Sequence, residues 1–306
     1  MIESGMIFYS INNYAMWIFK FITDFFKRIT EHDSESSTVT NNEPTGNTTG
    51  VNMIKRGLFV GINDYPGTNN DLNGCVNDFK DWTKELATSF GVSSYATLVN
   101  EQATKESIKK NLTKMINKSV PGDLVVFTYS GHGSFVVDTS KDEPDSKDET
   151  LYTYNGNLVD DELRAIISKA QDGVKIVIIL DSCHSGTGTR MYKPNSPKPR
   201  FMPPTDPEVI RLGSILPFAK ATTDEENMKE ILFSGCKSTE YSYDANYNGV
   251  PNGAFTKVAI EALKKLKDPT YQEWYDEIRR NLPSRDYPQT PQFEGSRANK
   301  NRKVFS

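Results

Sequence analysis

The sequence has few of the residues that form covalent cross-links or metal clusters. Only three cysteines are present, Cys75, Cys183 and Cys236, and no two of them form a CxxC pair. Three cysteines cannot make a disulfide framework, and this spacing does not predict a zinc or dithiol redox site. A reducing compartment is therefore expected, and we predict a cytoplasmic location.

Histidine and excess positive charge are also lacking. His32, His132 and His184 are the only histidines in 306 residues, so any chemistry that needs an imidazole must use one of them. The 36 Lys and Arg residues are balanced by 40 Asp and Glu. Nucleic-acid binding needs clustered positive charge to replace counterions, so no nucleic-acid partner is expected. Hydrophobic residues make up 36%, enough for a core, which excludes a wholly disordered chain.

The first fifty or so residues differ from the rest. Residues 1–30 are hydrophobic and amphipathic, but polar residues such as Lys20 and Asp24 interrupt them. They fall short of the roughly 20 apolar residues that a membrane span needs, and they lack the features of a secretory signal. Two alternatives remain: membrane contact through an interfacial helix, or packing on a protein surface. Residues 31–52 predict a flexible linker, in which His32 is solvated and inert.

From residue 53 to residue 306, short apolar runs alternate with segments of helical spacing. The predicted strands are 55–62, 95–99, 123–130, 174–180 and 230–234. The predicted helices are 71–90, 105–117, 160–169, 254–266 and 271–281. This alternation predicts an α/β domain with a mainly parallel sheet and helices on both faces. Ligands of such sheets bind beyond the carboxyl ends of the strands.

Two predicted strands end in small, glycine-flanked reactive residues. One runs into YSGHG at 129–133 and the other into DSCHSG at 181–186. A thiol is mostly protonated at neutral pH, and a nearby imidazole can remove its proton to give a nucleophilic thiolate. Because neighbouring parallel strands end at one edge of a sheet, we predict that His132 and Cys183 meet there.

Two alternatives stand beside this prediction. Cys183 by itself could be a small buried core residue at the end of a strand. His184 is a rival base, although adjacent residues on an extended chain point to opposite faces.

Asp181, two residues before the thiol, shares its face and should select a cationic substrate group. The alternative for Asp181 is a structural cap.

The two motifs, about fifty residues apart, resemble those of the metacaspases, cysteine peptidases of the caspase-like family C14. Supporting stretches are GCVNDF at 74–79, VDDEL at 159–163 and FSGC at 233–236. The resemblance covers residues 55–305 and is closest to the short prokaryotic forms called orthocaspases. It implies a caspase–haemoglobinase fold, with a mainly parallel six-stranded sheet sandwiched by helices. It also implies a thiol protease that acts as a monomer on protein or peptide substrates.

By this resemblance, His132 is the general base and Cys183 the nucleophile of a dyad. The backbone N–H groups of Gly133 and Cys183 match the donors that stabilise the oxyanion. The residues that match the family's S1 pocket, which holds the side chain before the cut, are Cys75, Asp78, Ser130 and Asp181. We therefore expect cleavage after Arg or Lys. A solvent-facing position is the alternative for Asp78, and Asp244 is expected to help wall the pocket.

Many metacaspases need calcium, and the resemblance suggests where an ion would bind. Asp148, Asp160 and Asp161 match three carboxylates of the family's calcium site. The fourth carboxylate is replaced here by Arg190, which should weaken such a site. The alternative is a solvated acidic loop at 138–149, with Asp160 or Asp161 capping the next helix. We expect no cofactor to be required.

A long segment, 187–224, follows the predicted nucleophile and is rich in proline and basic residues. Exposed basic residues in a flexible loop would suit an enzyme that cuts after Arg or Lys, so we predict self-cleavage here or in the N-terminal region. The alternative is a passive surface loop. Two other functions compete with the whole interpretation: a catalytically idle scaffold that binds partners, and a legumain- or clostripain-like peptidase of different specificity.

Overall fold

The computed structural model describes residues 53–138, 147–183, 197–207, 209–211 and 224–306. The predictions for residues 1–30, 31–52, His184 and Arg190 lie outside the described residues. None of the helices in the described part of the chain has the length and apolar character needed to cross a membrane.

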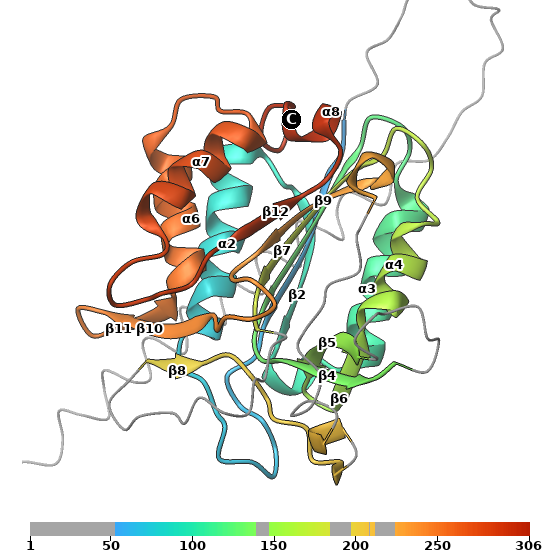
Figure 1. Ribbon diagram of the computed structural model, residues 1–306. Helices are drawn as coiled ribbons and strands as arrows, with labels where there is room; N and C mark the ends of the chain where they lie inside the picture. The colour runs from blue at the N-terminus through green and yellow to red at the C-terminus, as the bar shows by residue number, and fades with distance from the viewer. Residues whose placement is uncertain (1–52, 139–146, 184–196, 208, 212–223) are drawn as a thin grey trace, which may run out of the picture. The chain divides into compact units, whose positions relative to one another are not determined.

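A six-stranded sheet lies at the centre of the described residues (Figure 1), in the order β12-β9-β7-β3-β1-β2. Its strands are β1 (Lys55–Gly61), β2 (Ser94–Val99), β3 (Leu124–Ser130), β7 (Lys175–Asp181), β9 (Glu230–Ser234) and β12 (Gln292–Glu294). Five strands are parallel, and only β12 is antiparallel to its neighbour. The predicted α/β fold with a mainly parallel six-stranded sheet is confirmed. Strands such as β3 are buried on both faces, which explains their continuous apolar sequence.

Helices cover both faces of this sheet (Figure 1). One face carries α2 (Cys75–Phe90), α6 (Ala254–Lys265) and α7 (Tyr271–Asn281), and the other carries α3 (Lys105–Lys118) and α4 (Asp160–Ile167). Successive strand residues point to opposite faces, so Phe59 joins the core that contains Trp82, whereas Leu58 joins the core that contains Ile108. Burying each such side chain stabilises the fold by about 1.5–3 kcal/mol.

Two small sheets, which the sequence pattern does not predict, lie near the carboxyl ends of the parallel strands (Figure 1). One contains β4 (Gly133–Val137), β5 (Lys147–Thr153) and β6 (Gly156–Val159), and the other contains β8 (Lys198–Pro199), β10 (Tyr243–Tyr247) and β11 (Val250–Gly253). Other short elements are the 3₁₀ turns η1 (Asn100–Gln102) and η2 (Glu225–Asn227) and the helix α8 (Arg297–Lys300). The predicted acidic loop at 138–149 is therefore partly wrong, because residues 147–149 belong to β5.

Candidate active site

The ends of β3 and β7 form the floor of the candidate site. Ser130 and Asp181, the last residues of these neighbouring strands, are register partners. The chain continues from them to Gly133 and Cys183, whose N–H groups both donate to the carbonyl oxygen of Arg200, at 3.0 and 3.1 Å. The two N–H groups that were predicted as oxyanion donors, those of Gly133 and Cys183, thus point at the same carbonyl oxygen.

His132 is fully buried, and its ring is held in one orientation. Its Nε2 atom lies 2.5 Å from the carbonyl oxygen of Asn70, and the Tyr65 ring centroid lies 4.6 Å from its own. A carbonyl oxygen can only accept, so Nε2 carries the proton and Nδ1 keeps a free lone pair. Nδ1 is buried and has no hydrogen-bond partner among the described residues. Burial also lowers the pKa of His132 to about 4, which keeps the ring neutral.

Cys183 is also fully buried, and its Sγ atom contacts the main chain of Ser242. The Ser242 N–H donates to Sγ at 3.0 Å, and Sγ lies 3.3 Å from the Ser242 carbonyl oxygen. Within the described residues no hydrogen bond joins Sγ to the His132 ring. Instead, the N–H groups of Cys183 and of Gly133, the residue after His132, both donate to the peptide group between Arg200 and Phe201.

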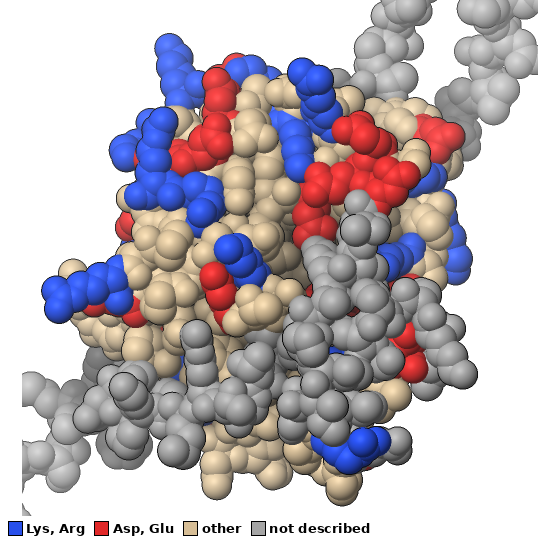
Figure 2. Space-filling view, viewed as in Figure 1, with Lys and Arg blue, Asp and Glu red and all other residues tan. Residues whose placement is uncertain are grey.

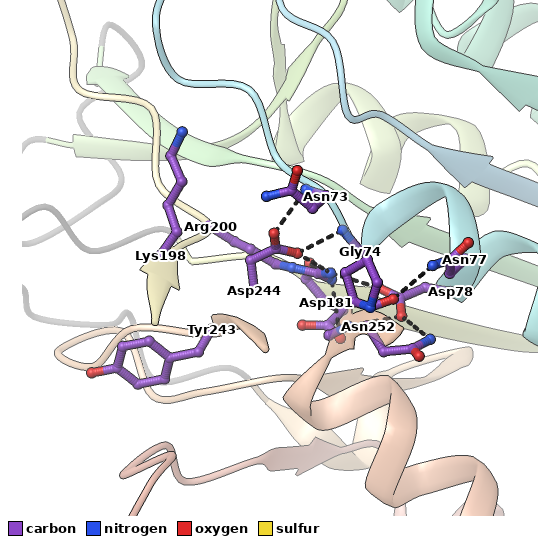
Figure 3. A network of polar contacts seen from close by, with 12 residues as sticks. Asn73, Gly74, Asn77, Asp78, Asp181, Lys198, Arg200, Tyr243, Asp244 and Asn252 are labelled. Atoms are coloured by element: carbon purple, nitrogen blue, oxygen red, sulfur yellow. Dashed lines mark hydrogen bonds and ion pairs between the residues drawn. The ribbon is translucent and has the colours of Figure 1, made fainter. Parts of the chain in front are cut away.

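The Arg200 side chain fills a pocket of negative charge (Figure 3). Its guanidinium is completely buried and lies 2.7 Å from Asp78, 3.2 Å from Asp181 and 3.1 Å from Asp244. One cation cannot balance three carboxylates away from water. Burial therefore raises the pKa of Asp78 to about 6, although Arg200 opposes the shift.

Each of these carboxylates is also held by donors that belong to the pocket wall, as the dashed lines in Figure 3 show in part. These donors are Asn252 Nδ2 and Gly253 N for Asp78, Ser242 Oγ, Thr256 N and Thr256 Oγ1 for Asp181, and Asn73 N and Gly74 N for Asp244, at 2.6–3.2 Å. Each carboxylate is therefore bonded to the pocket wall as well as to the Arg200 guanidinium.

The structure places the predicted S1 residues together. Asp78 is completely buried, so the alternative of a solvent-facing helix residue is wrong. Asp181 faces the guanidinium and also accepts the N–H of Thr256 in the first turn of α6, so it lines the pocket and caps a helix. Cys75 and Ser130 are buried at the start of α2 and the end of β3. Burial raises the pKa of the Cys75 thiol.

Several residues of the site were not identified from the sequence. Basic residues of the 187–224 segment were expected to be exposed, and for Arg200 this is wrong. Ser242, Asn70 and Thr256 act through main-chain groups or single hydroxyls, which leave no motif. Asp244 lies beside the Arg200 guanidinium, and it accepts the N–H groups of Asn73 and Gly74 just before α2 begins, at Cys75 rather than at the predicted residue 71.

The predicted calcium ligands are not gathered into a cation site. Asp160 and Asp161 stand in the first turn of α4, and Arg164 pairs with both. The cap of that helix comes from Glu162, which accepts the N–H of Val159 at 3.3 Å. Asp148 lies on β5. The described residues contain no group of three or more acidic, His or Cys side chains that could hold a metal ion, so this arrangement does not fit calcium.

Charged side chains of both signs lie on the surface of the molecule, in contrast to the acidic cluster around Arg200. On the face shown in Figure 2, Lys and Arg side chains are interspersed with Asp and Glu. A pocket of about 200 Å³ between α4 and the sheet is lined mainly by apolar atoms, and its lining also includes Glu149, Glu230 and Glu294. These residues are distinct from those around Arg200.

Comparison with known sequences identifies relatives of this chain. A family model described as metacaspase, peptidase C14 domain matches residues 55–191. Metacaspase-1 of Botryotinia fuckeliana is 30% identical over 285 residues, which span 79% of this chain and 68% of that protein. Metacaspase-1 of Meyerozyma guilliermondii is 29% identical over 287 residues, 79% of this chain and 69% of that protein.

Solved structures with the same fold are also known. A Geobacter sulfurreducens protein is 31% identical and superposes with a TM-score of 0.65, covering 83% of this chain and 98% of that one. Caspase-1 of Spodoptera frugiperda superposes with a TM-score of 0.54 over 84% of this chain and 94% of that one. At 11% identity the second likeness concerns the fold alone.

Proposed function

The chain belongs to the metacaspase family and is a cysteine-type endopeptidase, and we propose that it cuts peptide bonds after Arg or Lys with a His132–Cys183 dyad. The observation that carries this proposal is the position of Arg200. Its side chain fills the acidic pocket while its carbonyl oxygen accepts two converging N–H groups. A substrate residue before the cut would need both contacts.

The proposed reaction starts with proton transfer from the Cys183 thiol to Nδ1 of His132. The thiolate attacks the carbonyl carbon of the basic residue, and the N–H groups of Gly133 and Cys183 stabilise the oxyanion. The imidazolium then protonates the leaving amine, and the C–N bond breaks to give a thioester. His132 next takes a proton from water, which attacks the thioester and releases the acid and the thiol. Asn70 is a positioning residue, because its carbonyl keeps the Nε2 proton in place.

The preference for a basic residue follows from charge. Asp181 and Asp78 are fixed by other donors, so an uncharged side chain in the pocket would leave buried carboxylates without a counterion. Losing one partner of such a buried pair costs about 3–5 kcal/mol, which corresponds to a selectivity of at least a hundredfold. Peptides with Arg, Lys or Asp before the cut test this. Equal rates, or preferred cleavage after Asp, would contradict it.

The dyad is tested on the same peptides with Cys183→Ala and His132→Ala. We expect both variants to lose nearly all activity while still unfolding cooperatively on heating. Arg285→Ala, which changes an exposed arginine, is the control for purification and handling. Full activity in either dyad variant would refute the proposed roles, and inactivity of the wild type as well would favour the idle-scaffold alternative.

Self-processing is proposed at one bond, the peptide between Arg200 and Phe201. This peptide already lies where a substrate would, with the Arg200 N–H bonded to the Ser242 carbonyl at 2.9 Å. Until it is cut and leaves, it blocks the pocket. We expect wild-type protein to convert into fragments that meet at this bond, whereas Cys183→Ala stays intact; identical band patterns on a gel would contradict the proposal.

A further inference from the structure

We propose that the candidate active site also selects the residue that follows the cut, and that the position which binds this residue prefers an aromatic ring. This inference rests on the proposed function, because it takes Arg200 as the residue before the cut and Phe201 as the one after it. The occupied site is formed by Phe135 on β4 and Tyr241, which precedes β10.

The Phe201 ring contacts two aromatic rings from separate parts of the fold. Its centroid lies 6.2 Å from that of Phe135 with the planes 17° apart, and 6.4 Å from that of Tyr241 with the planes 48° apart. Both distances are within the range in which aromatic pairs attract one another beyond simple burial. With Phe201 in place Phe135 is only 2% exposed, and the Lys147 Nζ atom lies 5.5 Å from its ring centroid.

The main chain fixes where the side chain after the cut must point. Gly133 donates its N–H to Arg200 O at 3.0 Å and accepts the N–H of Met202 at 2.8 Å. These two bonds hold the main chain immediately before and after Phe201. The Ser134 hydroxyl donates to Met202 O at 2.8 Å. Any substrate held in the oxyanion hole with the same bonds would direct its corresponding side chain at Phe135.

The strand β4 contains both Gly133, the proposed oxyanion donor, and Phe135, two residues further along the same face. One strand thus supplies an oxyanion donor and the ring that would contact the substrate residue after the cut. Because this residue leaves with the amine, the aromatic contact acts on formation of the thioester and not on its hydrolysis.

The test uses self-processed wild-type enzyme and internally quenched peptides that contain Lys-Pro-Arg followed by Phe, Tyr, Leu, Ala or Asp. We expect kcat/KM for Phe and Tyr to exceed that for Ala and Asp by about tenfold, as two aromatic contacts of ordinary strength would give. Rates within twofold of one another, or a preference for Asp, would overturn the inference. If no peptide were cut, the proposed function would fail instead.

Variants assign the preference to the two rings. Phe135→Leu and Tyr241→Leu should each reduce the ratio of Phe to Ala peptides to about threefold or less, while the preference for Arg before the cut stays. Tyr241 is only partly buried, so its variant remains informative if Phe135→Leu does not fold. Tyr95→Leu, on an exposed tyrosine of β2, is the matched control and should keep the tenfold ratio. An unchanged ratio in both ring variants would refute the assignment.

Discussion

Removing the Arg200 side chain tests the electrostatics of the buried cluster. The comparison is between Cys183→Ala and Cys183→Ala/Arg200→Ala, so that self-cleavage affects neither protein. The second variant leaves Asp78, Asp181 and Asp244 buried without their cation. Breaking a buried ion pair costs about 3–5 kcal/mol, and each kcal/mol lowers the Tm of a domain of this size by about 2–4 °C. At pH 8 we therefore expect the Tm to fall by roughly 6–20 °C.

The loss of stability should depend on pH. The pKa of Asp78 is raised from 3.8 to about 6 by burial, so the folded state holds this proton more tightly than the unfolded state. The resulting stabilisation is fully present below about pH 4 and is lost as pH rises through about 6. Without Arg200, which lowers this pKa, the shift becomes larger. The difference in Tm between the two proteins should therefore be clearly smaller at pH 5 than at pH 8.

Thermal denaturation at both pH values measures this directly, and a small guanidinium ion supplies a second readout. Methylguanidinium at 100 times its dissociation constant would restore about 2.7 kcal/mol to the double variant, which lacks the Arg200 side chain, and nothing to the single variant. Arg285→Ala in the same background is the control for loss of an arginine. Equal Tm values at pH 8 with and without Arg200 would refute the account of the pocket.

Further predictions concern catalysis and metal dependence. Asp181→Asn should reduce kcat/KM for Arg peptides by about a hundredfold, because a charge-assisted bond to the substrate is lost; wild-type values would contradict this. His132→Ala should lower kcat by about 10²–10⁴, and a smaller effect would argue against general base catalysis. Gly253→Ala should abolish cleavage after Arg, since a Cβ there would lie 2.0 Å from Asp181 Oδ2; an active variant would refute the packing. Activity should be independent of calcium, which titration with calcium and a chelator checks; strict dependence would show that ligands outside this arrangement exist.

The central sheet could be predicted because its chemistry is local. Strands such as β3 and β7 are buried on both faces and must be apolar throughout, so the sequence itself marks them. The edge strand β12 and the strand β8 have only three and two residues, and the pairing of β8 with β10 depends on contacts between residues 44 or more positions apart in sequence. Such pairings are set by the tertiary structure and leave no periodic pattern.

The candidate site was predictable to the same extent. His132, Cys183 and the acidic pocket could be found because each follows a recognisable strand or matches a family motif. Arg200 could not, since nothing in its proline-rich segment distinguishes it from the other basic residues there. Only the fold shows that its carbonyl meets Gly133 and Cys183 while its guanidinium meets three carboxylates.

The most direct test of the central claim is the N-terminal residue of the fragment that forms when purified wild-type protein is incubated. Mass spectrometry should identify a new fragment that begins at Phe201, formed at a rate independent of protein concentration and absent from Cys183→Ala. A fragment that begins elsewhere, or the same fragment in the Cys183→Ala sample, would contradict the assignment of Arg200 as a bound substrate residue.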